Sequence, residues 1–153
     1  MSRQLHESGE NYLENIYILR QRIGFVRSVD LATEMNFSKP SVSRAVHLLQ
    51  DNNYIVIGED GGLELTAEGE ELAKGIYERH VFLTEYLISI GVPQHVASED
   101  ACRIEHVLSP ESYEAMKIHA AESPEHNIQV TEDGIFAYNK NAIRAGENSL
   151  LDP

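Results

Sequence analysis

The fold of this chain is decided by residues 28–66, SVDLATEMNFSKPSVSRAVHLLQDNNYIVIGEDGGLELT. Apolar side chains recur at helical spacing in two stretches of this segment, 28–35 and 38–53. The pair Asn36-Phe37 separates the two stretches and turns the chain. Two helices joined by so short a connection predict a helix-turn-helix, whose second helix can enter the major groove of DNA.

The ends of these elements carry their own sequence signals. Ser28 and Ser38 stand where an N-cap residue is favoured, and Pro40 fits the first turn of a helix because its missing N–H costs little there. Residues 54–58 and 63–66 are short apolar strands around Glu59-Asp60-Gly61-Gly62, a hairpin pattern because glycine supplies positive φ. The whole segment therefore predicts a winged helix-turn-helix.

Further helices are expected on both sides of this segment. One precedes it over 9–22, and Thr66 is the expected N-cap of a long helix that Gly91 ends. The fold class that follows is mainly α, with an N-terminal winged helix-turn-helix domain and a second, helical domain. The expected domains are 1–70, 71–121 and a partly ordered extension over 122–153; the later helices are 66–90, 93–108 and 109–121, and the last strands are 128–130 and 135–138.

Length and composition limit the class of protein. A chain of 153 residues with 42% hydrophobic residues can form one ordinary domain or two very small ones with a buried core. It contains no apolar run of about 20 residues, which a membrane span needs, and its start lacks a hydrophobic secretory segment. The single cysteine, Cys102, cannot form an internal disulfide. We therefore expect a cytoplasmic protein that does not bind a membrane.

The formal net charge of -13 is unevenly distributed along the chain. Residues 1–53 hold six basic and six acidic side chains, whereas residues 54–153 hold six basic and nineteen acidic ones. A neutral first part can approach phosphate, and an acidic second part can bind cations. The alternative is that the acidic excess serves only solubility.

The start of the second helix of the helix-turn-helix suits contact with DNA. Its small hydroxyl side chains allow a close approach, and Arg44 can bond a guanine edge in a bidentate manner. Arg27, Ser38 and Lys39 are candidates for phosphate contacts, whereas the acidic hairpin tip at Glu59 argues against a tight wing contact. Ser38 and Pro40 can also be read as ordinary helix-start residues. The candidates for DNA contact are Arg27, Ser38, Lys39, Pro40, Ser41, Ser43 and Arg44.

A second group of residues has the chemistry of a metal site. Cys102, Glu105 and His106 are spaced i, i+3 and i+4, so their side chains share one face if a helix runs through them. Thiolate, carboxylate and imidazole are ligands of divalent first-row metals. An antiparallel pair of helices would bring His80 opposite Cys102, and Asn11 and Glu14 offer oxygen donors from the first helix.

Simpler roles exist for each of these residues. A lone cysteine on a helix is often a small buried hydrophobe, and Glu14 can be a solvated carboxylate. A catalytic pair of Cys102 and His106 is disfavoured, because residues in mid-helix lack an oxyanion hole. We therefore expect no enzyme activity.

Taken together, the two groups resemble the diphtheria toxin repressor and manganese transport regulator family of metal-dependent transcriptional regulators. The resemblance covers about residues 8–120, and its most specific element is EDACRIEHVLS over 99–109. ENYLENIY over 10–17, Arg79-His80, and LTAEG over 65–69 also match. The resemblance implies a helical metal-binding and dimerisation domain, a homodimer on a palindromic double-stranded DNA operator, activation by Fe(II) or Mn(II), and repression of metal-uptake genes.

The same resemblance implies a ligand set and two departures from the family pattern. The implied ligands are Asn11, Glu14, His80, Cys102, Glu105 and His106. Asn11 stands where iron-responsive members have Met and manganese-responsive members have Asp. Glu14 resembles the manganese branch, and Cys102 the iron branch. His80 is compatible with a second metal site of the family, but Thr84 and Ser98 stand where iron-type members have Glu and His, which disfavours that site and leaves its presence open.

Fe(II) is favoured over Mn(II), because a thiolate suits Fe(II) better and Fe(II) lies higher in the affinity order. Co(II), Ni(II) or Zn(II) should substitute in vitro. An alternative is a winged-helix regulator that senses a small organic ligand or thiol oxidation through Cys102. Two more distant alternatives are a thiol-dependent enzyme and a protein-interaction module whose acidic C-terminal region binds a basic partner.

Overall fold

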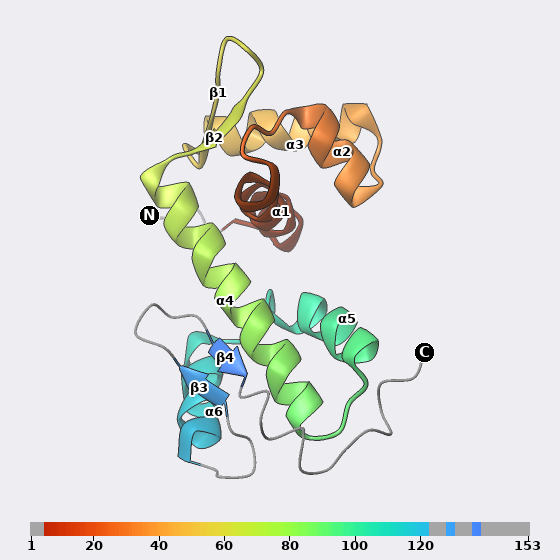
Figure 1. The fold of residues 1–153 in the computed structure, drawn as a ribbon. Helices are drawn as coiled ribbons and strands as arrows, with labels where there is room; N and C mark the ends of the chain where they lie inside the picture. The colour runs from red at the N-terminus through yellow and green to blue at the C-terminus, as the bar shows by residue number, and fades with distance from the viewer. Residues whose placement is uncertain (1–4, 123–127, 131–135, 139–153) are drawn as a thin grey trace. The chain divides into compact units, whose positions relative to one another are not determined.

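The chain forms two compact units that share one long helix. A computed structural model describes residues 5–122, 128–130 and 136–138 (Figure 1). The boundary between the units falls after Tyr77, inside helix α4 (Ala67–Ser89), which is continuous. Each unit has a buried apolar cluster of its own.

The first unit is a winged helix-turn-helix, as the sequence predicts. Its two strands pair antiparallel, with Ile55 opposite Leu65 and Ile57 opposite Leu63. The order of elements before α4 is three helices followed by a two-stranded hairpin (Figure 1). The elements are α1 (Glu7–Ile23), α2 (Ser28–Met35), α3 (Lys39–Asp51), β1 (Ile55–Ile57) and β2 (Leu63–Leu65).

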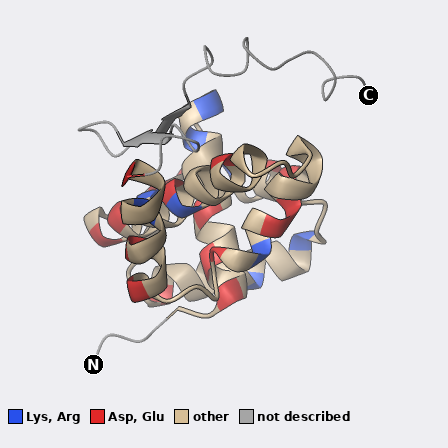
Figure 2. Ribbon diagram, turned by 90° about the horizontal axis from the view of Figure 1, so that it is seen from below, with Lys and Arg blue, Asp and Glu red and all other residues tan. Residues whose placement is uncertain are grey.

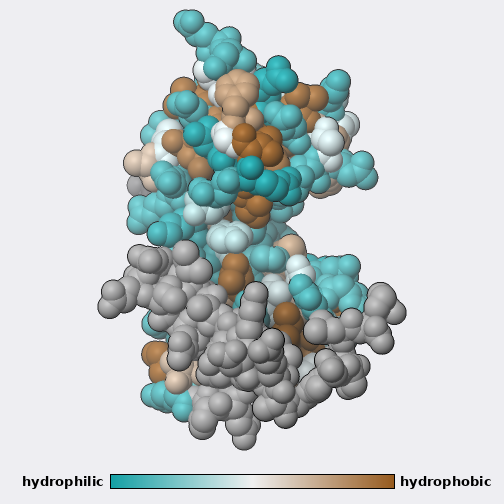
Figure 3. All heavy atoms as spheres, in the orientation of Figure 1, coloured by the Kyte–Doolittle hydropathy of each residue, from teal (hydrophilic) through white to brown (hydrophobic). Residues whose placement is uncertain are grey.

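One apolar core holds this unit together. Helix α3 buries Val42, Val46 and Leu49, which recur at the i, i+4 and i+7 spacing of a single helix face. Leu13 of α1 and Leu31 of α2 are fully buried in the same cluster. The visible face of the first unit shows scattered apolar side chains among hydrophilic ones (Figure 3). The buried face of α3 thus packs against the core of the unit, and the opposite face of the helix is exposed to solvent.

The caps of α2 and α3 are different from each other. Ser38 caps α3 as predicted: the backbone N–H of Ser41 donates to Ser38 Oγ at 3.3 Å. The prediction that Ser28 caps α2 is wrong, because Ser28 is already the first helical residue. Asp30 Oδ2 accepts the backbone N–H of Arg27 at 2.8 Å, so the helix begins one residue earlier than the serine indicates.

The junction between the wing and α4 is fixed by Thr66 and Gly69. The Gly69 N–H donates to Thr66 Oγ1 at 3.0 Å, which caps α4 as the sequence predicts. The same hydroxyl donates to the carbonyl oxygen of Asn53 at 2.7 Å. A Cβ on Gly69 would lie 1.9 Å from the carbonyl oxygen of Tyr54, so only glycine fits at this position.

The second unit contains the end of α4, then α5 (Gln94–Ile104), α6 (Pro110–Glu122), β3 (Ile128–Val130) and β4 (Phe136–Tyr138). Phe82, Leu83, Ala101 and Ala120 form its buried core. Strands β3 and β4 pair antiparallel, close to the expected positions. The rest of the predicted extension over 122–153 lies outside the described residues.

The prediction that the helix after Pro93 continues to Leu108 is wrong. Helix α5 ends at Ile104, because the N–H groups of Val107 and Leu108 both donate to the Ile104 carbonyl and close a turn. Pro110 then starts α6, with Ser109 Oγ accepting the Ser112 N–H at 3.1 Å.

Within the described part of the chain, no helix is long and apolar enough to cross a membrane.

The two glycines of α4 should respond in opposite ways to alanine. Gly69→Ala should destabilise the protein by about 2 kcal/mol or more, because its Cβ would overlap a backbone carbonyl. Gly75→Ala meets nothing within 4 Å and should stabilise the helix by about 0.5–1 kcal/mol. Urea unfolding of both variants measures the difference. Equal effects at the two positions would contradict the close approach at Gly69.

Candidate metal centre and nucleic-acid interface

Three side chains of the second unit form a compact cluster of metal-ligand types. His80 Nδ1 lies 2.8 Å from Glu105 Oε2 and 3.7 Å from Cys102 Sγ. One ligand atom from each of the three residues lies within 4.8 Å of the other two. The cluster therefore offers nitrogen, sulfur and oxygen donors, the set that suits a divalent first-row metal.

Glu105 is the most buried member of this cluster. Glu105 is only 1% exposed, whereas Cys102 is exposed to solvent. His106 Nε2 lies 3.3 Å from Glu105 Oε1, so an imidazole faces each oxygen of the carboxylate. The structure therefore brings together four of the six predicted ligands: His80, Cys102, Glu105 and His106.

The neighbours of His80 favour its protonated form. Hydrogen bonds with Cys102 and then with Glu105 raise the pKa of His80 to about 10, although burial acts in the opposite direction. In the metal-free protein the imidazole is therefore a cation at neutral pH. Its charge balances the buried carboxylate.

Cys102, Glu105 and His106 do not all lie on one helix face as predicted. Cys102 is in α5, but Glu105 is the C-cap residue and His106 lies in the following turn. The i, i+3 spacing still places Cys102 and Glu105 on the same side of the chain, because Glu105 keeps helical backbone angles, with φ -57° and ψ -28°. The candidate ligands Cys102, Glu105 and His106 thus lie at a helix end rather than in mid-helix.

Asn11 and Glu14, the other two predicted ligands, lie on α1 in the first unit. Glu14 is 4% exposed, and Asn11 Oδ1 accepts a hydrogen bond from Asn15 Nδ2 at 3.2 Å. Their membership in the metal site stays a prediction. Thr84, at a position where the resemblance implies a second-site ligand in iron-type members, donates its hydroxyl to the His80 carbonyl at 2.8 Å.

The predicted DNA-contact residues cluster at the start of α3 and beside the wing. Lys39, Pro40, Ser43 and Arg44 are exposed, whereas Ser41 is half-buried. Ser41 Oγ accepts hydrogen bonds from the Ser38 hydroxyl at 2.8 Å and from Arg44 Nη2 at 3.5 Å. Ser38 and Ser41 therefore order the helix start, and Arg44 stays on the solvent side.

Arg27 is exposed and lies in the segment that pairs with the wing, opposite Gly62. Over the described helices acidic residues are frequent (Figure 2). Helix α3 is an exception, because Lys39 and Arg44 precede its single acidic residue, Asp51. The N-terminal part of this helix thus lacks carboxylates that would repel phosphate.

Sequence reasoning missed His47 as a candidate for DNA contact. His47 is exposed, and its Nδ1 lies 2.7 Å from the carbonyl oxygen of Ser43, one helical turn earlier. The spacing i+4 from Ser43 and i+3 from Arg44 could have identified it, because residues at this spacing share a helix face.

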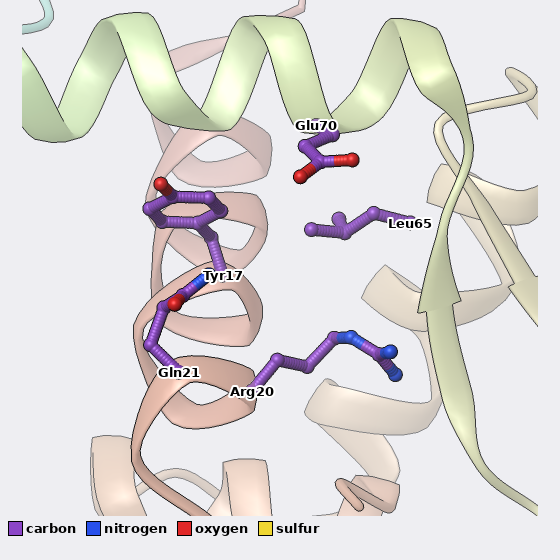
Figure 4. Close-up of a pocket in the computed structure, with 5 residues that line it drawn as sticks. All are labelled: Tyr17, Arg20, Gln21, Leu65 and Glu70. Carbon is purple, nitrogen blue, oxygen red and sulfur yellow. The ribbon is translucent and has the colours of Figure 1, made fainter. Parts of the chain in front are cut away.

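The first unit also has a small cavity between α1, β2 and the start of α4 (Figure 4). Its volume is about 210 Å³, and Tyr17, Arg20, Gln21, Leu65 and Glu70 line it. Arg20 Nη1 donates to the carbonyl oxygen of Leu63 at 2.7 Å and thereby ties α1 to the wing. This side chain serves the fold of the unit and does not point to a ligand.

Fold and site together define a class: a winged helix-turn-helix DNA-binding protein with a second, helical unit that carries a cluster of metal-ligand side chains. The N-terminal DNA-binding domain of the iron-dependent repressors matches residues 4–63. The metal-binding and dimerisation domain of the same repressors matches residues 66–129. The chain belongs to the iron-dependent repressor family of transcriptional regulators, which confirms the predicted resemblance.

Curated relatives cover most of the chain. The transcriptional regulator MntR of Escherichia coli O6:H1 is 34% identical over 109 residues, which are 71% of this chain and 70% of the relative. The regulator MntR of Listeria monocytogenes serotype 4a is 38% identical over 103 residues, 67% of this chain and 72% of the relative. Both are named as regulators, in agreement with the prediction of a protein that is not an enzyme.

Solved structures show the same fold. The crystal structure of IdeR from T. acidophilum matches with a TM-score of 0.65 and 25% identity, over 85% of this chain and 65% of that one. The manganese regulator SloR matches with a TM-score of 0.69 and 23% identity, over 90% of this chain and 65% of that one. This chain thus spans about two thirds of the length of either solved protein.

The metal-free protein should lose the stabilising effect of His80 as the pH rises. The pKa of this imidazole is raised in the folded state, so its contribution is fully present below about pH 6.5 and is lost as the pH passes about 10. His80→Gln should therefore lower the melting temperature most near pH 6.5 and least near pH 10. Thermal unfolding in the presence of a chelator measures this. A pH-independent difference would contradict protonation of His80.

Proposed function

We propose that this protein is a metal-dependent transcriptional repressor that acts as a homodimer on a palindromic operator and controls metal-uptake genes. The observation that carries the proposal is the cluster of His80, Cys102 and Glu105, whose ligand atoms lie within 4.8 Å of one another in a chain that also has a winged helix-turn-helix. Family membership supports the proposal. We place the protein in the cytoplasm, where a free thiol stays reduced.

The residues present fit a divalent cation. His80, Cys102, Glu105 and His106 would hold it from the second unit, and Asn11 and Glu14 would complete the ligand set from α1. A bound dication supplies positive charge to a carboxylate and a thiolate that otherwise depend on a proton. Asn11 and Glu14 are included because the resemblance to the family implies them.

The chain's own residues provide the coupling between metal and DNA. Glu105 and His80 share a proton in the metal-free state, and this proton must leave before both can act as ligands. Ligands drawn from both units would favour one arrangement of the two recognition helices, about 34 Å apart for one turn of DNA. The coupling free energy expected for such a switch is about 1–3 kcal/mol.

Fe(II) is the proposed physiological metal, with Mn(II) as the alternative. Cys102 contributes a soft thiolate, which favours Fe(II), whereas Glu14 contributes a hard oxygen, which suits Mn(II). Co(II), Ni(II) and Zn(II) are expected to substitute in vitro. Binding titrations with a DNA fragment selected from a random pool, run anaerobically with Fe(II), Mn(II) and Zn(II), test the order of effectiveness.

A second candidate function is thiol-oxidation sensing through Cys102. Its favouring observation is that Cys102 is exposed and lies 3.7 Å from His80 Nδ1, an imidazole that carries positive charge at neutral pH. Peroxide treatment and metal titration separate the two functions. A sensor of oxidation would change its DNA affinity with peroxide and not with metal.

Glu105→Gln should still fold, with lower stability, because His80 can lose its proton once the carboxylate is gone, but it should lose the stimulation of DNA binding by metal. The amide keeps the size of the buried side chain and removes the anionic donor, so operator affinity with Mn(II) should fall about 10-fold or more, toward the metal-free value. His106→Ala should behave in the same way. Fluorescence anisotropy with labelled operator DNA measures the affinity.

Glu99→Gln is the matched control, because Glu99 is an exposed carboxylate of the same helix outside the cluster. This variant should keep the full response to metal. A Glu105→Gln protein with undiminished stimulation by Mn(II) would refute the proposed metal centre.

Lys39→Ala and Arg44→Ala should weaken DNA binding in distinguishable ways. Loss of a phosphate contact at Lys39 should reduce affinity for all sequences and lower the salt slope by about 1. Loss of a base contact at Arg44 should reduce the free energy of binding to operator DNA by about 1–3 kcal/mol and leave binding to random DNA unchanged. Lys74→Ala, at an exposed position of α4, is the control. Salt-dependent anisotropy with operator and random DNA measures all three, and equal losses for both variants would contradict these roles.

A further inference from the structure

The turn that carries Glu105 and His106 lies between helices α5 and α6. Helix α5 ends at Ile104, and α6 begins at Pro110, so the intervening backbone must find hydrogen bonds elsewhere. The Ile104 carbonyl accepts the N–H groups of Val107 and Leu108, at 3.0 and 2.9 Å. The carbonyls of Glu105 and Leu108 accept hydrogen bonds from a donor on another element.

Arg79 of α4 supplies that donor. Its Nη1 lies 3.0 Å from the carbonyl oxygen of Leu108 and 3.4 Å from that of Glu105. The two carbonyls flank His106 in the sequence, so one guanidinium spans the turn that holds it. A cation at the end of a helix is also favoured by the negative end of the helix dipole.

The guanidinium is itself held by the ring of Tyr113 on α6. The Arg79 guanidinium carbon lies 5.2 Å from the ring centroid, within the range of a cation–π contact. Tyr113 packs edge-on against the buried ring of Phe82, with centroids 5.6 Å apart and planes at 82°. Burial raises the pKa of Tyr113 to about 12, so the ring stays neutral at physiological pH.

Arg79 directly precedes His80 in α4. His80 Nδ1 lies 2.8 Å from Glu105 Oε2 of the carboxylate, and Arg79 donates to the Glu105 backbone carbonyl. The two contacts fix both the position of the turn and the direction of the carboxylate. Arg79 cannot be a ligand, because a guanidinium has no acceptor atom and stays protonated.

We propose that Arg79 is a positioning residue of the metal centre: it clamps the 105–108 turn so that Glu105 and His106 face His80 before metal binds. This inference rests on the proposed metal function of the same cluster. Groups that orient metal ligands through hydrogen bonds typically contribute about 10- to 100-fold to metal affinity.

The test uses Co(II) binding to the full-length protein, followed by absorption. Arg79→Met should lower the affinity for Co(II) about 10- to 100-fold and change the ligand-field spectrum at saturating Co(II), because the ligands are no longer held in one geometry. Arg79→Lys should be intermediate, since an ammonium can reach one carbonyl but lacks the planar fork. A role confined to folding would leave the spectrum of the saturated protein unchanged.

Lys117→Met is the matched control. Lys117 Nζ lies 4.7 Å from the centroid of the same Tyr113 ring, and no hydrogen bond from it to the 105–108 turn is found in the described structure. This variant should keep both the affinity, within about two-fold, and the spectrum of the unsubstituted protein.

Three outcomes have distinct meanings. Unchanged affinity and spectrum in Arg79→Met, with normal Co(II) binding by the unsubstituted protein, would overturn the positioning role and leave the metal function standing. An unsubstituted protein without Co(II) bands would instead refute the metal function. If Arg79→Met does not fold, Arg79→Lys decides: an altered spectrum supports the clamp, and an unaltered spectrum with unaltered affinity overturns it.

Discussion

The second unit depends on one electrostatic constraint, the burial of the Glu105 carboxylate. A charge removed from water is costly unless an opposite charge and hydrogen bonds compensate it. Here the residue is 1% exposed, and the imidazole of His80 lies 2.8 Å away with a pKa raised to about 10. In the metal-free protein, the proton on His80 compensates the charge of Glu105. In the proposed active state, a dication would compensate it, so metal binding and protonation of His80 compete.

Helix α4 connects this constraint to the DNA-binding unit. It begins at the Thr66 cap, where Gly69 packs against the Tyr54 carbonyl, and so its first turn is part of the winged helix-turn-helix. Further along the same helix, Arg79 and His80 reach the backbone and side chain of Glu105. One continuous helix thus carries both the closing contact of the wing and His80, one of the four clustered candidate ligands.

Much of the first unit could be predicted from local sequence, because its signals act over a few residues. The Ser38 cap, the hairpin glycines and the Val42, Val46, Leu49 face each depend on near neighbours, and the structure contains all of them. The prediction for Ser28 was wrong because Asp30, two residues later, accepts the backbone N–H of Arg27, and Ser28 is already helical. The end of α5 was missed because the turn at Ile104 breaks the pattern without a glycine or proline inside it.

The sequence by itself determined the winged helix-turn-helix, the types of the candidate ligands and the family, since periodicity, capping residues and the Cys102–His106 spacing are all local. Only the tertiary structure decided which candidate ligands meet. His80 lies 25 residues before Glu105, and their contact depends on how α4 packs against α5. The packing of α4 against the 105–108 turn and α6 placed Arg79 on the turn and Tyr113 beside it. Contacts between side chains of different helices depend on how the helices pack and on which charges pair. The spacing of residues within one helix does not determine either.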